Sequence, residues 1–186
     1  MTETTTSLPA GPVDDTDLVS EAQRDPSKFT ALYDRYLRPI YRYLYSRVGN
    51  ASDAEDLTAQ TFLSAFEALP RYRHQGHFSA WLFTIARNRV RDHYRPRTVE
   101  MPLNESQPNP ADDPLVQVVR SDQLAHMAKA IRSLSEGEKE LIRLRFAAEL
   151  SFSEIGECLG KREEAVKKSF YRLMTRLQRQ LEERHE

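Results

Sequence analysis

The chain has 186 residues, of which 27 are Lys or Arg and 28 are Asp or Glu, so its formal net charge at neutral pH is −1. Hydrophobic residues make up 39% and charged residues 30%, a composition that suits a water-soluble helical protein and excludes disorder throughout the chain. No stretch approaches the roughly 20 apolar residues of a membrane helix, and the single cysteine, Cys158, excludes a disulfide framework and a thiolate zinc cluster.

The N-terminal half predicts a leader followed by four helices. Residues 1–13 show no apolar period and are expected to be disordered. Aspartates at 14, 15 and 17 suit a first turn, and apolar residues then recur every three or four positions, interrupted by proline and glycine. The predicted helices span about 14–25, 29–48, 51–69 and 78–95. No segment alternates with period two, so no sheet is expected.

The C-terminal half predicts a second helical domain. Five prolines between 96 and 114, with Asn, Ser and Asp among them, have the composition of a flexible linker. Helical periodicity resumes near Leu115 and continues through the segment SEGEKELIRLRFAAEL, in which Ser135 and Glu138 form a capping-box pattern. The sequence therefore predicts an all-α chain of two small helical domains, 14–95 and 115–186, joined by the linker 96–114.

Positive charge is concentrated in one segment of each predicted domain. Residues 71–97 carry seven Arg against one acid, and residues 161–181 carry seven Lys or Arg against two acids. A basic stretch alone is often only a solvated helix face. Two of them, both interleaved with aromatic residues, fit a polyanion held at two separated places.

The last segment has the pattern of a helix-turn-helix. Ser151 to Leu159 reads as a short capped helix with Ile155, Cys158 and Leu159 inward, and Gly160 marks the turn. A second helix beginning near Arg162 is predicted to bury Ala165, Val166, Phe170, Leu173 and Leu177. Cations on its outer face suit the DNA major groove, although an ordinary helical hairpin with a basic face is the alternative.

No catalytic or cofactor motif accompanies these features. The six glycines form no nucleotide-binding loop, and neither G-x-S-x-G nor H-E-x-x-H occurs. No carboxylate or cysteine stands at metal-ligand spacing from His74, His77 or His93, so no metal site is expected. Because no set of nucleophile, base and orienting residue is found either, no enzyme is expected. The acidic, Thr-rich N-terminus lacks a signal-peptide pattern, so a cytoplasmic protein without membrane insertion is expected.

Four segments in order make the chain resemble bacterial RNA polymerase sigma factors of the extracytoplasmic-function (ECF) group, in the sigma-70 family. They are FTALYDRYLRPIYRYLYSRV, DAEDLTAQTFLSAF, FSAWLFTIARNRVRDHYR and LSFSEIGECLGKREEAVKKSFYRLMTRL. The first three look like sigma region 2, which would cover 14–95, and the last looks like region 4, within 115–186. The resemblance implies a subunit that directs promoter-specific initiation, with core RNA polymerase, promoter DNA and an anti-sigma factor as partners.

The resemblance also implies roles for particular residues. The clamp helices of the largest polymerase subunit would be bound by Asp53, Glu55, Asp56 and Gln60, and the flap of the second-largest subunit would be a further contact. The minus-ten element would be read by Tyr72, Arg73, His74, Arg87, Asn88 and Arg91. The minus-thirty-five element would be read by Lys167, Lys168, Ser169, Tyr171, Arg172 and Arg176.

Some residues keep a second interpretation. The acids near Asp53 can simply complement a helix dipole, and Trp81 is interpreted as a core residue rather than a stacking platform. Cys158 is interpreted as a small buried hydrophobe rather than a redox sensor. The rival function is a free-standing helix-turn-helix repressor or activator, which would bind a palindromic duplex as a dimer without polymerase.

Overall fold

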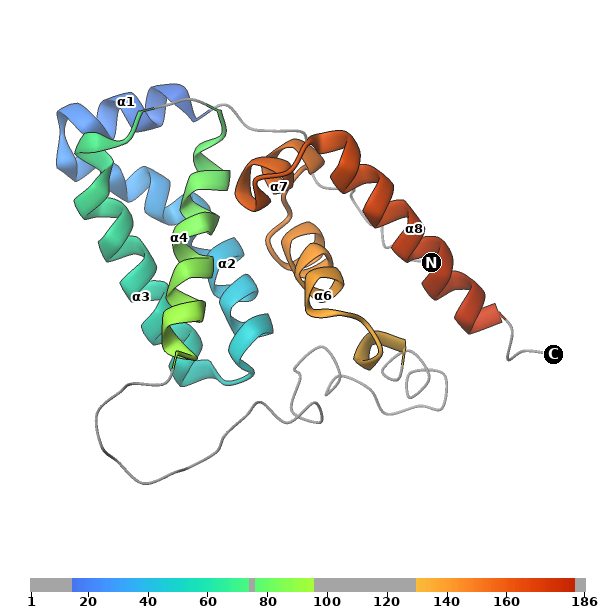
Figure 1. Cartoon of the computed structure of the whole chain (residues 1–186). Coiled ribbons are helices and arrows are strands. Elements are labelled where there is room, and N and C mark those ends of the chain that lie inside the picture. The colour runs from blue at the N-terminus through green and yellow to red at the C-terminus, as the bar shows by residue number, and fades with distance from the viewer. Residues whose placement is uncertain (1–14, 74–75, 96–129, 183–186) are drawn as a thin grey trace, which may run out of the picture.

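The computed structural model describes residues 15–73, 76–95 and 130–182, and every regular element in these ranges is a helix (Figure 1). The predicted all-α class is therefore confirmed for the described residues. The predicted leader and linker, the start of the second domain at Leu115, and His74 lie outside them.

Residues 15–95 form a bundle of four helices joined by short turns, called here the N-terminal bundle. Its elements are α1 (Thr16–Arg24), η1 (Pro26–Lys28), α2 (Phe29–Val48), α3 (Ala51–Ala68), η2 (Leu69–Arg71) and α4 (Phe78–His93). Gly49, at φ 82°, ends α2 in the left-handed conformation that glycine adopts readily. The Asn50 side chain then accepts a hydrogen bond from the Asp53 amide and starts α3.

At the start of α1, Asp15 has a role that the sequence did not predict. This residue occupies the N-cap position but its carboxylate makes no cap hydrogen bond. Instead it is buried, and it accepts hydrogen bonds from the Arg35 guanidinium and the Tyr36 hydroxyl of α2. Burial, together with the bond to Asp15, raises the pKa of Tyr36 far above its usual value. Asp15 therefore links α1 to α2 through side-chain hydrogen bonds and does not cap its own helix.

Residues 130–182 supply the C-terminal helices, drawn from orange to red in Figure 1. They are α6 (Glu136–Ile142), the π-helical η4 (Arg143–Ala147), α7 (Phe152–Leu159) and α8 (Glu163–Glu182). The predicted capping box of Ser135 and Glu138 is present, and a second box joins Ser151 and Glu154. Both boxes satisfy backbone amides that a helix start leaves without partners.

We expect Ser151→Ala to lower the free energy of unfolding by about 1 kcal/mol, because it removes the hydroxyl that accepts from the Glu154 amide. The Ser151→Thr variant keeps a hydroxyl acceptor and is the matched control, expected to stay near the wild-type value. Urea denaturation followed by circular dichroism measures both. Equal stability of the alanine and threonine variants would contradict the cap's contribution.

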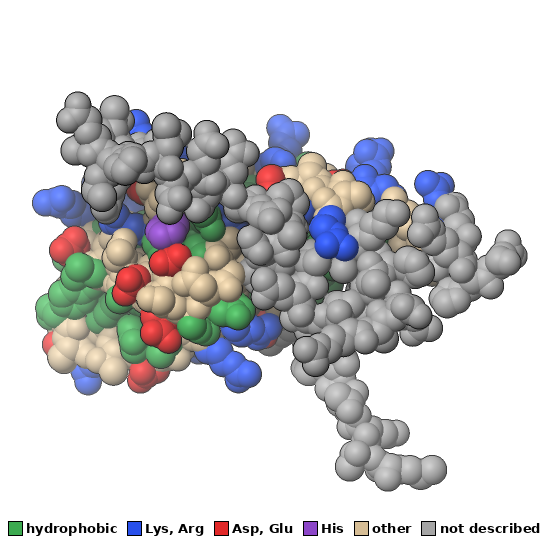
Figure 2. Space-filling view, turned by 90° about the horizontal axis from the view of Figure 1, so that it is seen from below, with side chains coloured by type: hydrophobic (Ala, Val, Ile, Leu, Met, Phe, Trp, Pro, Cys, Tyr) green, Lys and Arg blue, Asp and Glu red, His purple; other side chains and the backbone are tan. Residues whose placement is uncertain are grey.

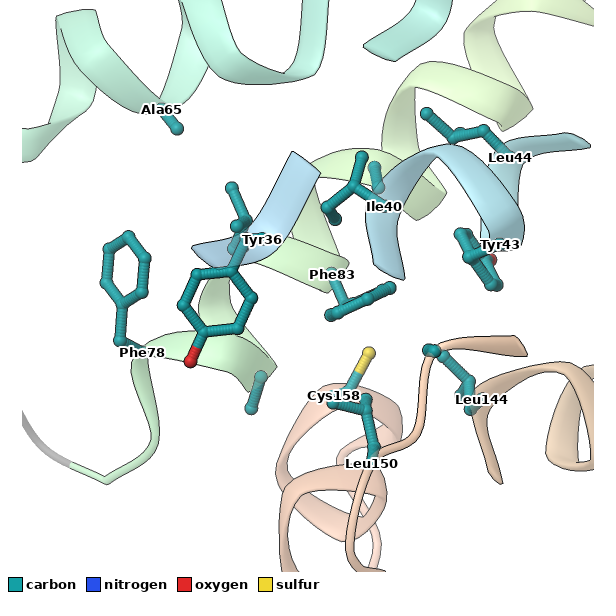
Figure 3. Packing of buried hydrophobic residues seen from close by; sticks show 14 of the residues in the cluster. Tyr36, Ile40, Tyr43, Leu44, Ala65, Phe78, Phe83, Leu144, Leu150 and Cys158 are labelled. Carbon is teal, nitrogen blue, oxygen red and sulfur yellow. The ribbon is translucent and has the colours of Figure 1, made fainter. Parts of the chain in front are cut away.

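The N-terminal bundle and the C-terminal helices share one hydrophobic core. Helix α4 packs against α7, and α2 packs against η4. Figure 3 shows Phe83 and Tyr43 of the bundle facing Leu144, Leu150 and Cys158 of the C-terminal helices. All five side chains are buried in the same cluster. The two parts therefore form a closed arrangement, which the sequence did not predict.

Candidate nucleic-acid interface

The first of three candidate binding faces is the exposed side of α3. Glu55, Asp56 and Gln60 are exposed there, whereas Asp53 is half-buried and lies 3.6 Å from the His93 ring. Farther along the same helix, Leu63 and Phe66 are also exposed. Figure 2 shows acidic side chains scattered among hydrophobic ones on the left side of the molecule. The structure therefore combines the predicted acids with an apolar strip.

From helical periodicity alone, Phe66 would be counted with the apolar stripe of its helix, and no local pattern indicates that its ring stays exposed. Phe66 instead packs edge-on against Phe29 at a centroid distance of 5.2 Å while 42% of its surface stays exposed. Leu63 is 59% exposed. Exposed apolar residues beside carboxylates are typical of a protein-binding surface.

The second face lies at the N-terminal end of α4 and contains an open cleft of about 390 Å³. The Tyr72 and Trp81 rings stand side by side at a centroid distance of 4.5 Å. The cleft is lined by Arg71, Tyr72, Arg73, His77, Ala80, Trp81, Thr84 and Glu157. Aromatic rings beside guanidinium groups can stack on an unpaired base and neutralise its phosphate.

Trp81 only partly follows its interpretation as a core residue. It packs against the core but keeps a partly exposed surface that lines the cleft. Tyr72 is likewise half-buried, and burial raises the pKa of its hydroxyl. Arg71 was not among the predicted contacts, although its place in the basic loop before Tyr72 was a usable signal.

The other predicted minus-ten residues separate into two groups. Arg73, Asn88 and Arg91 are exposed on the loop and α4. Arg87 instead points into the contact between the two parts, where its Nε lies 2.8 Å from Glu140 Oε1 and its NH1 lies 2.8 Å from the Cys158 carbonyl oxygen. In this structure, Arg87 is bound to the C-terminal helices and is only partly exposed, whereas Asn88 is exposed.

The Glu140 carboxylate accepts hydrogen bonds from three residues of the N-terminal bundle. Besides Arg87, it accepts a hydrogen bond from the Tyr43 hydroxyl at 2.8 Å and one from Arg47 NH1 at 3.1 Å. Burial, together with the negative charge of Glu140, raises the pKa of Tyr43 well above its usual value. The carboxylate is therefore a buried junction between α2, α4 and α6.

The third face is the helix-turn-helix of α7 and α8, joined at Gly160 in the left-handed conformation. Val166, Phe170 and Leu173 are buried as predicted. Ala165 is exposed, so the prediction that it is buried is wrong. The buried stripe runs through positions 166, 170 and 173. Ala165 precedes Val166 by one residue, so its side chain is turned about 100° away from this stripe.

The predicted minus-thirty-five residues mostly lie on the outer face of α8. Lys168, Ser169, Tyr171 and Arg172 are exposed, and Lys167 is half-buried and ion-paired with Glu163 at 2.8 Å. Lys and Arg side chains project along the right side of the molecule in Figure 2. The ion pair of Lys167 with Glu163 lowers the net positive charge with which this part of α8 can attract a phosphate.

Arg176 is bound to α6 rather than free on the surface. Its NH2 lies 2.6 Å from Glu138 Oε1. Although burial alone would raise the pKa of Glu138, hydrogen bonds from Ser135 and the Arg176 ion pair hold that pKa below its usual value. Arg176 therefore supports the packing of α8 on α6 in this structure.

An aromatic cluster beside the helix-turn-helix was also missed by the sequence pattern. Phe152 lies 5.2 Å from Phe170 and 5.9 Å from Tyr171 between ring centroids, and the Arg145 guanidinium stacks over it at 4.9 Å. Phe146 extends the cluster and is 56% exposed. This cluster anchors Tyr171 at the edge of the outer face of α8.

The described residues offer no support for a metal site, a membrane span or a reactive cysteine. Among the described residues, no group of three His, Cys, Asp or Glu side chains could hold a metal ion. None of the described helices combines the length and the hydropathy that crossing a bilayer requires. Cys158 is buried, and burial raises the pKa of its thiol, which disfavours the reactive thiolate.

Comparison with protein families assigns both parts of the chain. Residues 32–99 match the model for Sigma-70 region 2, and residues 130–179 match the model for Sigma-70, region 4. The α3 face and all of the α4 cleft except Glu157 thus fall in region 2, and the helix-turn-helix falls in region 4.

Individual relatives and solved structures agree with this assignment. The chain is 38% identical to the ECF RNA polymerase sigma factor BldN of Streptomyces coelicolor over 89% of its own length and 65% of that relative. It is 33% identical to ShbA, an ECF sigma factor of Streptomyces griseus, over 73% of its own length and 78% of ShbA. The fold resembles CnrH, solved in complex with the cytosolic domain of CnrY, with a TM-score of 0.65, 26% identity and coverage of 91% of this chain and 98% of CnrH. The chain therefore belongs to the ECF group of the sigma-70 family, non-enzymatic factors that act in promoter-specific transcription initiation.

Proposed function

We propose that this chain binds core RNA polymerase and directs it to promoters through two separated DNA contacts. The cleft of Tyr72 and Trp81, with Asn88 farther along α4, would capture the unpaired minus-ten strand. The exposed face of α8 around Arg172 would read the minus-thirty-five element in the major groove. The observation that carries the proposal is the aromatic and cationic cleft, because a simple helix-turn-helix regulator does not need one.

Polymerase would be held at two places. Glu55, Asp56 and Gln60, exposed on α3 beside Leu63 and Phe66, suit docking on the clamp helices of the largest subunit. Region 4 would contact the flap of the second-largest subunit. Since each DNA contact alone offers few phosphate pairs, both are weak until polymerase holds them at a fixed separation.

An anti-sigma factor is the third proposed partner. The CnrH structure is a complex with the cytosolic domain of CnrY, and the Bartonella quintana sigma factor RpoE was solved with the anti-sigma factor NepR. A partner of this kind would act on this chain in the cytoplasm. The functional units would be region 2 over 14–95 and region 4 over 115–186.

Run-off transcription tests the proposal. Purified core polymerase is assayed with and without the full chain on a genomic fragment that carries the protein's own upstream region. A transcript that depends on the protein and starts at one site supports it. Absence of a transcript, together with absence of a polymerase complex by gel filtration, would favour a free-standing regulator instead.

For the upstream element, we expect Arg172→Ala to lower run-off transcription by roughly ten- to a hundred-fold on a promoter that needs its minus-thirty-five sequence, because a base or phosphate contact of Arg172 would be lost. Arg24→Ala removes an exposed arginine from α1 and is the matched control, expected to transcribe normally. Wild-type output from Arg172→Ala on that promoter would remove Arg172 from the interface.

A further inference from the structure

We propose that Gln23 on α1 is a positioning residue for minus-ten recognition, because its side-chain amide holds the backbone from which Tyr72 enters the α4 cleft. Gln23 acts on the captured base through the rings of Tyr72 and Trp81 and does not touch DNA itself. This inference deepens the proposed function and rests on it, since it concerns how the same cleft keeps its shape.

The Gln23 amide spans the short helix η2, which leads into the cleft. Its Nε2 donates one hydrogen bond to the Leu69 carbonyl oxygen at 2.9 Å and another to the Tyr72 carbonyl oxygen at 2.7 Å. Because a carbonyl oxygen only accepts hydrogen bonds, the nitrogen of the side-chain amide must face both partners. One side chain of α1 therefore holds both ends of η2, which lie 46 and 49 positions later in the sequence.

The backbone at Tyr72 leaves the helix at this point. The Tyr72 amide still bonds to the Leu69 carbonyl oxygen at 3.0 Å, but Tyr72 itself is extended, with φ −65° and ψ 128°. A residue at the end of a helix leaves its carbonyl oxygen without an intrahelical partner. Gln23 supplies a partner for that oxygen, so it restrains the direction in which the chain continues to Arg73.

The Tyr72 ring forms one wall of the cleft, and α4 supplies the other. The ring centroid lies 4.5 Å from that of Trp81 and 5.7 Å from that of Phe78. A gap of about 0.5–1 Å between facing atoms already forfeits a quarter to a half of their dispersion energy. A small shift of the Tyr72 backbone therefore weakens stacking on a captured base.

Helix α1 is a firm support for Gln23. Figure 1 shows α1 lying across the end of the N-terminal bundle at which α3 ends and α4 begins. Val19 and Ala22 of α1 are buried in the core, and the Asp15 carboxylate accepts a hydrogen bond from the Tyr36 hydroxyl of α2. The amide of Gln23 thus transmits the fixed position of α1 to the loop that carries Tyr72.

The exposure of Gln23 separates this role from a role in folding. The residue is exposed, so its hydrogen bonds compete with water and contribute little to the stability of the whole chain. Their effect is local, on a loop that packing alone restrains less than a helix. Removing the amide should therefore change the cleft and leave the fold intact.

The first test uses Trp81 as the reporter, because it is the only tryptophan in the sequence. Gln23→Met keeps the length of the side chain, adds no charge and removes both donors. We expect acrylamide to quench the fluorescence of the full-length variant about two-fold more strongly than that of wild type, because a loosened Tyr72 ring covers Trp81 less well. Thermal unfolding followed by circular dichroism should be unchanged.

A control variant separates the loss of the amide from a general change in α1. Glu21→Met replaces another exposed side chain of the same length on the same helix. Its Trp81 fluorescence should be quenched as in wild type. Equal increases in quenching in the two methionine variants, or no increase in Gln23→Met, would overturn the positioning role.

The second test measures discrimination between minus-ten sequences. It compares run-off transcription by core polymerase and the full chain on the mapped promoter and on a copy with one minus-ten base changed. Phosphate contacts carry no sequence information, so the ratio of the two rates reports base reading. Since one mismatched base pair costs about 1–3 kcal/mol, we expect Gln23→Met to lower this ratio by roughly three- to ten-fold.

Gln23→Lys is the rescue variant, because an ammonium group restores N–H donors near the two carbonyl oxygens. Its added charge acts on both promoters alike, so the ratio should return most of the way to the wild-type value. Failure of Gln23→Lys to restore any of the ratio would count against hydrogen-bond donation as the cause.

The outcomes separate this inference from the proposed function. If wild type gives a protein-dependent transcript but Gln23→Met discriminates as well as wild type does, the positioning role falls and the proposed function stands. If wild type neither transcribes nor binds polymerase, the proposed function falls, and the minus-ten role of Gln23 falls with it even where the fluorescence shows that Gln23 holds the cleft.

Discussion

Trp81→Ala is expected to slow open-complex formation by roughly ten- to a hundred-fold, since stacking of a base on an aromatic ring contributes about 1–3 kcal/mol. Trp81 and Tyr72 stand 4.5 Å apart in the α4 cleft, where an unpaired base can reach both rings. The rate is measured by stopped-flow fluorescence of a promoter labelled at the minus-ten element, with polymerase binding checked by gel filtration.

Trp81→Phe is the matched control for this prediction, because it keeps a stacking ring and much of the contact with Phe78. It should retain most of the melting rate. If Trp81→Ala lowered the melting temperature of the protein but melted the promoter at the wild-type rate, Trp81 would be a packing residue only, as its helical spacing first indicated.

Leu82→Ala is expected to lower the free energy of unfolding by about 2–5 kcal/mol. Leu82 is fully buried in the shared core, so truncation removes apolar burial and leaves a cavity. A loss of this size is a large part of the stability of an ordinary domain. Urea denaturation of the full chain, followed by circular dichroism, measures it.

Leu63→Ala makes the same chemical change at a position that is 59% exposed. Its effect on stability should stay within about 0.5 kcal/mol, because little burial is lost and no cavity forms. Similar losses in the two variants would mean that Leu82 is not in a packed core. Under the proposed function, Leu63→Ala should weaken polymerase binding instead.

Helix positions in this chain were predictable because their signals are local. Gly49 and Asn50 stand between α2 and α3, and Ser135 with Glu138 starts α6, as the capping patterns indicated. The fold class and the order of the two regions followed from such signals. The exposed cations of α8 were also found this way, since a helix face is set by a period of 3.6 residues.

The partners of charged side chains were not predictable from local patterns. Arg87 was expected on DNA, but its partner Glu140 lies 53 positions later and shares no motif with it. Asp15 was expected only to suit the first turn of α1, yet Arg35 and Tyr36 hold its carboxylate inside the bundle. Tertiary contacts decide such cases.

The candidate cleft was only half predictable for a similar reason. Tyr72 and Arg73 were identified from the basic, aromatic loop. Trp81, in contrast, was placed in the core because of its helical spacing. Its ring is wide enough to pack on Phe78 and still line the cleft. The presence of Glu157 beside them follows from the packing of α7 on α4, which the chain's own periodicity does not encode.

The contacts between the N-terminal bundle and the C-terminal helices join residues far apart in the sequence. This separation sets the order in which a nascent chain forms its contacts. Arg87 and Cys158 are 71 residues apart, and Tyr43 and Glu140 are 97 apart. At about 5–20 residues per second, the ribosome needs roughly 4–14 s to travel from Arg87 to Cys158. Throughout that interval the α4 segment exists without the α7 residues that later pack against it, so its other contacts within the N-terminal bundle form first.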